Sequence, residues 1–457
     1  MDTGADTYPW PLLCCPRCAG SLAPPPSLAC TSCGKGYPLV DGVPWLLPEP
    51  DAALGEWRVR VRAFTAELET QAAKYRAALA GGVSRSATRN RLKLLAAACS
   101  DHARRLRALL APLGAEPSGA AVETYRALHA APRAGQGLAA YYTNLHRDWC
   151  WGEAENEVAL RAVSAALGEE GPGRTLVLGS GAGRLAYDLR VRRGAQPLVA
   201  ADVNPLMTLV ARRVLAGECV ELYEFPVAPR DLQSHALLRR LHAPAPAPEG
   251  LYPVLADVSQ GPFAAEAFDT VVTPWLIDIV DEDFATIAAH VNRWLRPGGR
   301  WVNSGSLFFE HAEAARCYST EEVREIVEAG GFEFTHFVEE TTPYLCSPAS
   351  RHGRLETVVT FSAVRTAASS APPRHEPVQA WLRSDDTPVP LLPEFGSRAL
   401  AMRIHAYVAS LVDGRRTLRE IADVLVRERL MTADEAGPAV RSFLQRLYDE
   451  AQLPWRP

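Results

Sequence analysis

Short apolar runs alternate with amphipathic segments through the middle of the chain. Apolar runs at residues 175–178, 197–201, 252–256 and 269–273 have the length of buried strands. Segments that begin at residue 184 and near residue 282 have the spacing of helices. Strands that alternate with helices in this way predict an α/β fold built on a parallel sheet.

Three glycines, Gly179, Gly181 and Gly183, follow the first predicted strand at alternate positions. Glycine allows the tight turn and the close approach of a ligand that a nucleotide site needs. A dinucleotide fingerprint would place glycine or alanine at position 184, where the chain has Arg184. The spacing therefore favours S-adenosyl-L-methionine (SAM) over NAD, and a tight turn without a ligand is the alternative.

Acidic residues follow the next three predicted strands. Asp202 could accept both ribose hydroxyls of a nucleoside, with Asn204 two residues further on. Asp257 stands where an adenine amino group needs an acceptor, and Asp278 follows the fourth strand. Ligands of such sheets bind at the carboxyl ends of the strands, so we expect these side chains to share one edge. Each acid alone could be an ordinary loop residue, but the ordered set indicates a nucleotide site.

An Arg-Asp-Trp triplet, Arg147 to Trp149, precedes the glycine loop and is followed by Gly152 and Glu153. One interpretation is a helix with a buried tryptophan. The other is a lid whose Arg147 binds the carboxylate of SAM through two hydrogen bonds, as guanidinium geometry favours.

Five of the ten cysteines lie within the first 33 residues. Four of them form two CxxC pairs, which can complete a tetrahedral zinc site: Cys15, Cys18, Cys30 and Cys33. No histidine or carboxylate joins them, so the sequence predicts a structural Zn²⁺ ion. A metal-free turn pair and a redox dithiol are the alternatives, and Cys14 could compete as a ligand. The pattern indicates a reducing, cytoplasmic environment rather than a disulfide framework.

The 457 residues carry a net charge of −5, which argues against broad binding to nucleic acid or to anionic membranes. We find no apolar run long enough to cross a membrane and no features of a secretion signal at the start. Residues 51–136 are expected to form a helical bridge that breaks at Gly81 and Gly82, with basic residues on a solvated face.

Two resemblances give these patterns a context. Residues 8–50 resemble zinc ribbons of the Trm112 type, which accompany methyltransferases. Residues 137–365 resemble the carnosine N-methyltransferase (N2227-like) family. The matching motifs are RDW with the downstream GE, LVLGSGAGRLAYDL, DVNPLM, LYEFP, TPWLID, LRPGGRWVNSGSLFFEH and YSTEEVREIVEAGGF.

The second resemblance implies a Rossmann-like class I SAM methyltransferase core that methylates a ring nitrogen of an imidazole. It implies that SAM is held, beside the other loop glycines, by Asn144, Arg147, Gly179, Asp202, Asn204, Asp257 and Val258. Asp278 and His311 would face the imidazole. An acceptor for one ring N–H selects the tautomer whose other nitrogen attacks, and Asp278 is the candidate. His311 is either a second polar contact or a structural histidine.

The chain departs from that family before its last predicted strand, where the family has a cluster of tyrosines. Here Tyr344 is the nearest tyrosine, and His352 and Arg354 stand in the segment itself. These three residues are the predicted substrate contacts, and arginine suits a carboxylate or another anion. The acceptor could be histidine, a thiol-bearing histidine or a histidyl dipeptide. A histidine in a peptide or protein is the alternative, and a non-catalytic scaffold is the third reading.

The remaining chain divides into a Pro-, Ser- and Ala-rich linker, residues 366–395, and a helical module, residues 396–457. Thr417 with Glu420 and Thr432 with Glu435 are predicted capping boxes. The module resembles PqqD-like winged-helix modules, which bind peptides in some peptide-modifying pathways. A packing or dimerisation role is the favoured interpretation, and a homodimer is one possible form of it. The predicted domains are a zinc ribbon (1–50), the bridge (51–136), the methyltransferase domain (137–365), the linker and the module.

Overall fold

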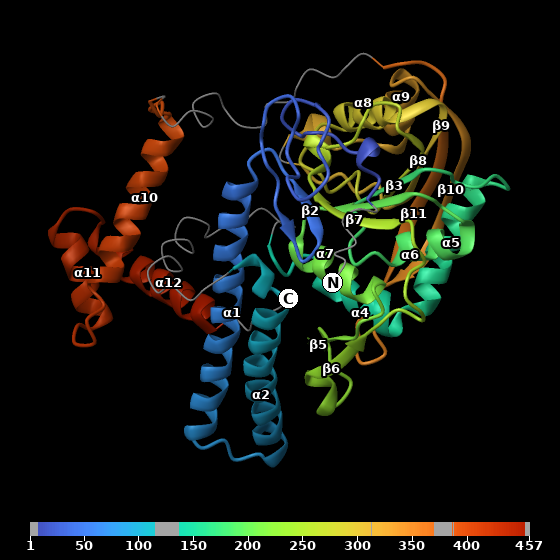
Figure 1. Cartoon of the computed structure of the whole chain (residues 1–457). Helices are drawn as coiled ribbons and strands as arrows, with labels where there is room; N and C mark the ends of the chain where they lie inside the picture. Colours follow the sequence, from blue (N-terminus) through green and yellow to red (C-terminus); the bar gives the residue numbers. More distant parts are fainter. Residues whose placement is uncertain (1–7, 115–136, 312, 370–385, 387, 453–457) are drawn as a thin grey trace. The chain divides into compact units, whose positions relative to one another are not determined.

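The computed structural model describes residues 8–114, 137–311, 313–369, 386 and 388–452 (Figure 1). The chain forms two compact units, one within residues 1–375 and one within residues 376–455. None of the helices in the described parts of the chain has the length and apolar character that crossing a lipid bilayer requires.

A nine-stranded sheet in the order β1-β2-β7-β4-β3-β8-β9-β11-β10 is the centre of the first unit. In this order, the strands from β2 through β7, β4, β3 and β8 to β9 run parallel. Strand β11 lies antiparallel between β9 and β10. This arrangement confirms the α/β fold class. The strands that follow the bridge are β3 (Thr175–Leu178), β4 (Leu198–Asp202), β7 (Leu251–Ala256), β8 (Phe268–Pro274), β9 (Leu295–Gly305), β10 (Phe332–Tyr344) and β11 (Arg354–Arg365).

Helices cover both faces of this sheet, because successive side chains of each buried strand point to opposite sides. Val177 packs in the cluster that contains α5 (Glu153–Leu167) and α6 (Arg184–Arg193). Its neighbours Leu176 and Leu178 pack in the cluster of α8 (Phe284–Trp294) and α9 (Thr320–Ala329). A further helix, α7 (Pro205–Leu215), contacts β2, β4 and β7.

The segment predicted as a separate zinc ribbon is part of the same sheet. Its strands are β1 (Leu39–Val40) and β2 (Val43–Leu46), and β2 pairs in parallel with β7. Trp45 lies opposite Leu255 in this pairing. All four residues of β2 are buried, which a strand at the surface of an independent ribbon would not be. Residues 8–50 and the methyltransferase core therefore share one hydrophobic core.

The helical bridge is a hairpin of α1 (Pro50–Ala80) and α2 (Ser86–Leu109), broken at Gly81 and Gly82 as the sequence predicts (Figure 1). Most of the predicted loop that follows lies outside the described residues. Helix α2 packs against β5 (Val220–Glu224), which forms a separate two-stranded sheet with β6 (Leu237–Leu241). The sequence patterns did not reveal this second sheet.

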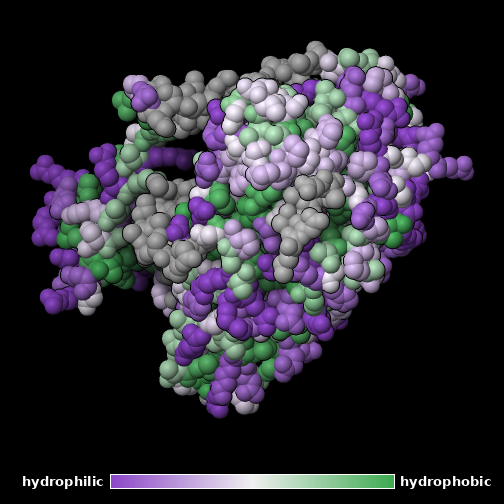
Figure 2. Space-filling model, in the orientation of Figure 1, coloured by the Kyte–Doolittle hydropathy of each residue, from purple (hydrophilic) through white to green (hydrophobic). Residues whose placement is uncertain are grey.

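The second unit contains α10 (Pro393–Ser410), α11 (Leu418–Arg427) and α12 (Ala433–Gln452). The capping box of Thr417 and Glu420 is confirmed, with the Glu420 N–H donating to Thr417 Oγ1 at 3.2 Å. Ile421, Ala422 and Leu425 form the core as expected, but Leu418 at the start of the predicted stripe is exposed. Figure 2 shows hydrophobic side chains among the hydrophilic ones on the surface of these helices.

Two histidines are buried inside the first unit. His102 of α2 lies edge-on to the rings of Tyr142 and Tyr223, and His146 packs against Tyr142. Their ring nitrogens have no hydrogen-bond partner among the described residues. The Tyr223 carbonyl lies near His146, but it accepts a hydrogen bond from the Tyr142 hydroxyl at 2.7 Å and none from the His146 ring. Burial lowers the pKa of both histidines to about 3, so both are neutral in the folded protein.

We expect acid to destabilise the first unit through these histidines. The unfolded chain takes up their protons below about pH 6.5, while the folded protein does not until about pH 3. The free energy of unfolding should therefore fall by about 1.4 kcal/mol per pH unit for each histidine over that range. The substitution His102→Phe should remove one histidine's share of the slope, as measured by urea unfolding between pH 7 and pH 5. The exposed His242→Gln serves as the control, and an unchanged slope in His102→Phe would contradict the assignment.

Candidate active site

The glycine loop follows β3 and leaves its backbone open to a ligand. Gly179, Gly181 and Gly183 have φ angles of +65°, +54° and +84°, which favour glycine. A Cβ on Gly179 would lie 2.9 Å from Leu276 Cδ1, whereas a Cβ on Gly181 would meet nothing within 4 Å. The space beside Gly181 is therefore free for a ligand.

Asp202 ends β4 directly beside this loop. Its Oδ2 accepts the Gly181 N–H and its Oδ1 accepts the Asn204 N–H, both at 2.8 Å. Burial raises the pKa of this carboxyl. The Asn204 side chain caps α7 through the Leu206 N–H at 3.0 Å and donates to the Leu138 carbonyl at 3.2 Å. Its amide is therefore already bonded within the chain.

The predicted acids share one edge of the sheet. Asp202 lies opposite Leu255 in the pairing of β4 with β7, two residues before Asp257. Asp257 Oδ1 accepts the Ser259 N–H at 2.9 Å and the Ser259 hydroxyl at 2.6 Å, and Val258 is half-buried beside it. Strand β8 runs parallel to β3 and, through β3, to β4. The loop with Asp278 that follows β8 therefore comes to the same edge.

Asp278 is a buried carboxyl with one oxygen unused. Its Oδ2 accepts the Ser306 hydroxyl at 2.6 Å and the Phe308 N–H at 3.1 Å. Its Oδ1 has no hydrogen-bond partner among the described residues. Burial raises the pKa of this carboxyl. Buried polar atoms are rarely left unpaired, so Oδ1 is a position at which a donor from a ligand can be satisfied.

Three residues with a strained backbone lie close to Tyr344 at this edge. Tyr141, Trp275 and Leu345 have φ angles of +60°, +50° and +53°, which are uncommon for such residues. The Trp275 and Tyr344 rings lie 4.4 Å apart between centroids. Partial burial raises the pKa of the Tyr141 hydroxyl, and the charges of Tyr344, Asp278 and Asp202 raise this pKa further. Backbone strain of this kind gathers at functional sites. Sequence reasoning did not single out Tyr141 or Trp275.

The three predicted substrate contacts, Tyr344, His352 and Arg354, line one cavity of about 170 Å³. The Arg354 guanidinium lies 4.7 Å above the centre of the Tyr344 ring and pairs with Glu356 at 2.6 Å. The cavity is also lined by Tyr142, Thr143, His146, Glu224, Phe225, Pro226, Val227, Leu345, Ser347 and Ser350.

Asn144 and Arg147 approach the same tyrosine from the segment before the glycine loop. Asn144 belongs to α4 (Tyr142–His146) and its Nδ2 donates to the Tyr344 hydroxyl at 3.4 Å. Arg147 begins a π-helical turn, η4 (Arg147–Trp151), and its guanidinium lies 5.4 Å from the centre of the Tyr344 ring. Turns of this kind are frequent at functional sites. The structure therefore brings Asn144 and Arg147, the predicted contacts of the methyl donor, to a tyrosine that lines the cavity.

His311 makes different contacts from those of Asp278. Its Nδ1 accepts the Glu313 N–H at 3.0 Å, and its Nε2 lies 2.6 Å from Arg316 Nη1 and 3.4 Å from Asp281 Oδ1. The contacts of His311 within the described residues thus connect it to the loop around Asp281. A role for His311 at the imidazole stays a prediction.

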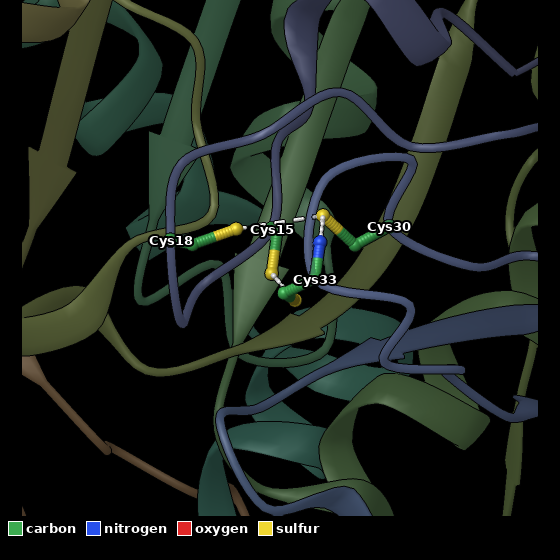
Figure 3. A group of neighbouring side chains, drawn as sticks. All are labelled: Cys15, Cys18, Cys30 and Cys33. Carbon is green, nitrogen blue, oxygen red and sulfur yellow. Dashed lines mark hydrogen bonds between the residues drawn. The ribbon is translucent and has the colours of Figure 1, made fainter.

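The four predicted metal ligands form a compact cluster (Figure 3). Their Sγ atoms all lie within 4.8 Å of one another, with Cys15 and Cys33 at 3.7 Å and Cys18 and Cys30 at 3.5 Å. Thiolates at about 2.3 Å from a tetrahedral zinc ion have similar separations. The Cys33 N–H donates to Cys30 Sγ at 3.4 Å, and the Tyr37 hydroxyl lies 2.9 Å from Cys15 Sγ.

Several solved structures match about half of this chain, at low sequence identity. A SAM-dependent methyltransferase from Mesorhizobium loti is 18% identical, with a TM-score of 0.32, and the match covers 47% of this chain and 99% of that chain. A phosphoethanolamine-type N-methyltransferase 2 from Haemonchus contortus is 14% identical, with a TM-score of 0.34 and coverage of 51% and 59%. A chain of the Trm112 methyltransferase activator complex from Haloferax volcanii is 16% identical, with a TM-score of 0.33 and coverage of 50% and 96%. No curated protein sequence matches the chain.

The family comparison is more specific. The model of the carnosine N-methyltransferase family matches residues 138–365, which contain the glycine loop, the acids at the sheet edge and the cavity around Tyr344. The protein is therefore a methyltransferase with SAM as its methyl donor, and its residues 138–365 match the carnosine N-methyltransferase family.

Proposed function

We propose that this enzyme methylates a ring nitrogen of an imidazole in a small histidine-derived molecule. The observation that carries the proposal is the unpaired, buried Oδ1 of Asp278 at the edge that also holds the glycine loop and Asp202. An imidazole N–H is a donor of the right kind for that oxygen. The family match to carnosine N-methyltransferase supports the same class of acceptor.

The residues at the sheet edge fit the methyl donor. The open space at Gly181 suits its close approach, Asp202 suits the ribose hydroxyls and Asp257 suits the adenine amino group. Arg147 and Asn144 suit the amino-acid end. When bound, SAM supplies an electrophilic methyl group on a sulfonium.

Asp278 would orient the acceptor. A ring N–H that donates to Oδ1 leaves the other ring nitrogen with its lone pair in the plane of the ring, ready to attack. The Ser306 hydroxyl and the Phe308 N–H hold the carboxylate from its far side, so its orientation is set before the substrate arrives. The ring becomes positively charged during transfer, and the carboxylate stabilises that charge.

Arg354 and His352 would meet the remainder of the substrate in the cavity. The exposed Arg354 guanidinium suits a carboxylate, which histidine, a thiol-bearing histidine and a histidyl dipeptide all carry. A histidine within a peptide is the alternative acceptor. A panel of these compounds, scored by mass spectrometry for a gain of one methyl group, separates the two. Methylation of another kind of nucleophile but of no imidazole would overturn the proposal.

We expect Asp202→Asn to weaken binding of S-adenosylhomocysteine about 100-fold. The substitution removes a charged acceptor for two ribose hydroxyls, each worth more than a neutral hydrogen bond. Isothermal titration calorimetry measures the affinity, and the exposed Glu218→Gln is the matched control. Equal affinity in Asp202→Asn and the wild type would show that the ribose lies elsewhere.

We expect Asp278→Asn to lower kcat by about 100-fold or more while binding of S-adenosylhomocysteine is unchanged. Ser306 and Phe308 both donate to this side chain, so the amide oxygen must face them. The amide NH₂ then occupies the position of Oδ1 and donates where an acceptor is needed. Single-turnover methylation measures the loss, with the exposed Asp231→Asn as the control. Full activity of Asp278→Asn would remove Asp278 from the mechanism.

We propose further that the four-cysteine cluster holds one structural Zn²⁺ ion. The Sγ separations suit a tetrahedral ion, and no histidine or carboxylate joins the group within the described residues. The ion would stabilise the segment that supplies β2 to the central sheet. The resemblance to Trm112-type ribbons suggests a scaffolding role for this segment.

We expect the purified protein to contain one zinc per chain by atomic absorption. The double substitution Cys30→Ser with Cys33→Ser should remove the metal and lower the melting temperature by several degrees, because metal binding contributes folding free energy. The exposed Cys219→Ser, outside the cluster, should change neither quantity. Zinc retained in full by the double variant would contradict the site.

A further inference from the structure

The guanidinium of Arg147 is held by its neighbour in sequence. Its Nε and Nη2 both donate to Asp148 Oδ1, at 2.9 and 2.6 Å. Asp148 is only 4% exposed, so this is a buried charge pair. Asp148 raises the pKa of Arg147 against the effect of burial, which keeps the guanidinium charged. The remaining terminal nitrogen, Nη1, makes no hydrogen bond within the described residues.

The position of Asp148 is itself fixed against the glycine loop. Its backbone carbonyl accepts Arg184 Nη1 at 3.0 Å and Asn156 Nδ2 at 3.2 Å. The indole of Trp149 donates to the Ala182 carbonyl at 2.9 Å, inside the loop. The Arg147–Asp148 pair is therefore tied to the same backbone that approaches the methyl donor.

The glycine and glutamate downstream of the triplet belong to the same arrangement. A Cβ on Gly152 would lie 2.4 Å from both the Cγ and the carbonyl oxygen of Arg147, so only glycine fits. The Glu153 carboxylate pairs with Arg184 Nη2 at 2.8 Å. The spacing of RDW and GE in the sequence is thus explained by one network around Arg147.

Tyr344 covers the guanidinium from another side, with its ring centre 5.4 Å away. The turn after Tyr344 is held by Glu155 of α5, which accepts the Leu345 N–H at 3.0 Å and the Cys346 N–H at 2.9 Å. Arg147 is therefore constrained by a carboxylate on one edge and an aromatic ring above. Its Nη1 edge is left for a ligand.

We propose that Asp148 is a positioning residue for the methyl donor: it directs the free edge of Arg147 toward the carboxylate of the donor's amino-acid end. The inference rests on the proposed function, because it assumes that the donor lies at this sheet edge. Arg147 and Asp148 together carry no net charge, so the pair recognises a carboxylate through directed hydrogen bonds. A guanidinium fixed in advance loses less freedom on binding, which strengthens the complex.

The test compares two ligands that differ at the amino-acid end. S-adenosylhomocysteine carries the carboxylate, and 5′-deoxy-5′-methylthioadenosine has the same nucleoside without it. We expect Asp148→Asn to weaken binding of S-adenosylhomocysteine by about tenfold or more and to leave binding of 5′-deoxy-5′-methylthioadenosine unchanged. Isothermal titration calorimetry measures both affinities. The control is Glu157→Gln, which breaks the exposed pair of Glu157 with Arg192 on the following helix. It should change neither affinity.

Asp148→Glu is the second variant, because it keeps the charge but displaces the carboxylate, and it should also weaken only S-adenosylhomocysteine. Arg147→Ala should abolish most of the difference between the two ligands, and adding Asp148→Asn to it should cause no further loss. Tighter or unchanged binding of S-adenosylhomocysteine by Asp148→Asn would overturn the inference, since it would mean that Asp148 only neutralises the arginine. Equal weakening of both ligands would also overturn it. A wild-type protein that binds neither ligand would instead refute the proposed function.

Discussion

The parallel pairing of β7, β4, β3 and β8 is the constraint on which the site depends. Parallel strands end at the same edge, so residues that are far apart in sequence become neighbours wherever the strands stop. Asp202 ends one of these strands, and the glycine loop, Asp257 and Asp278 each follow another. Helices on both faces bury most residues of these strands, so a shift of register would expose apolar side chains.

The elements that could be predicted are those whose signals are local. Buried strands appear as short apolar runs, the glycine loop shows its spacing directly, and the capping box at Thr417 and Glu420 marks the start of α11 within four residues. The four cysteines also form the cluster that their CxxC spacing predicts. In each case the interaction that stabilises the element joins residues close together in sequence, or follows from the general rule for parallel sheets.

The features that could not be predicted depend on contacts between distant segments. By its pattern alone, the apolar run with Trp45 could be a strand of an isolated ribbon. In the structure it pairs with β7, and Trp45 lies opposite Leu255, which is 210 residues further along the chain. The role of Tyr344 as the common neighbour of Trp275, Arg147 and Arg354 likewise arises only when four segments meet. Nor did helical periodicity reveal the π-helical turn at Arg147, because one extra residue in a turn barely alters the pattern.

The carboxylate of Glu155 joins the start of α5 to the wall of the cavity. It stands in the first turn of α5, directly after the turn that carries Arg147, and it anchors the backbone that forms part of the cavity wall. In the proposed site, the turn that would meet the methyl donor and the wall that would meet the acceptor are therefore anchored at one helix terminus.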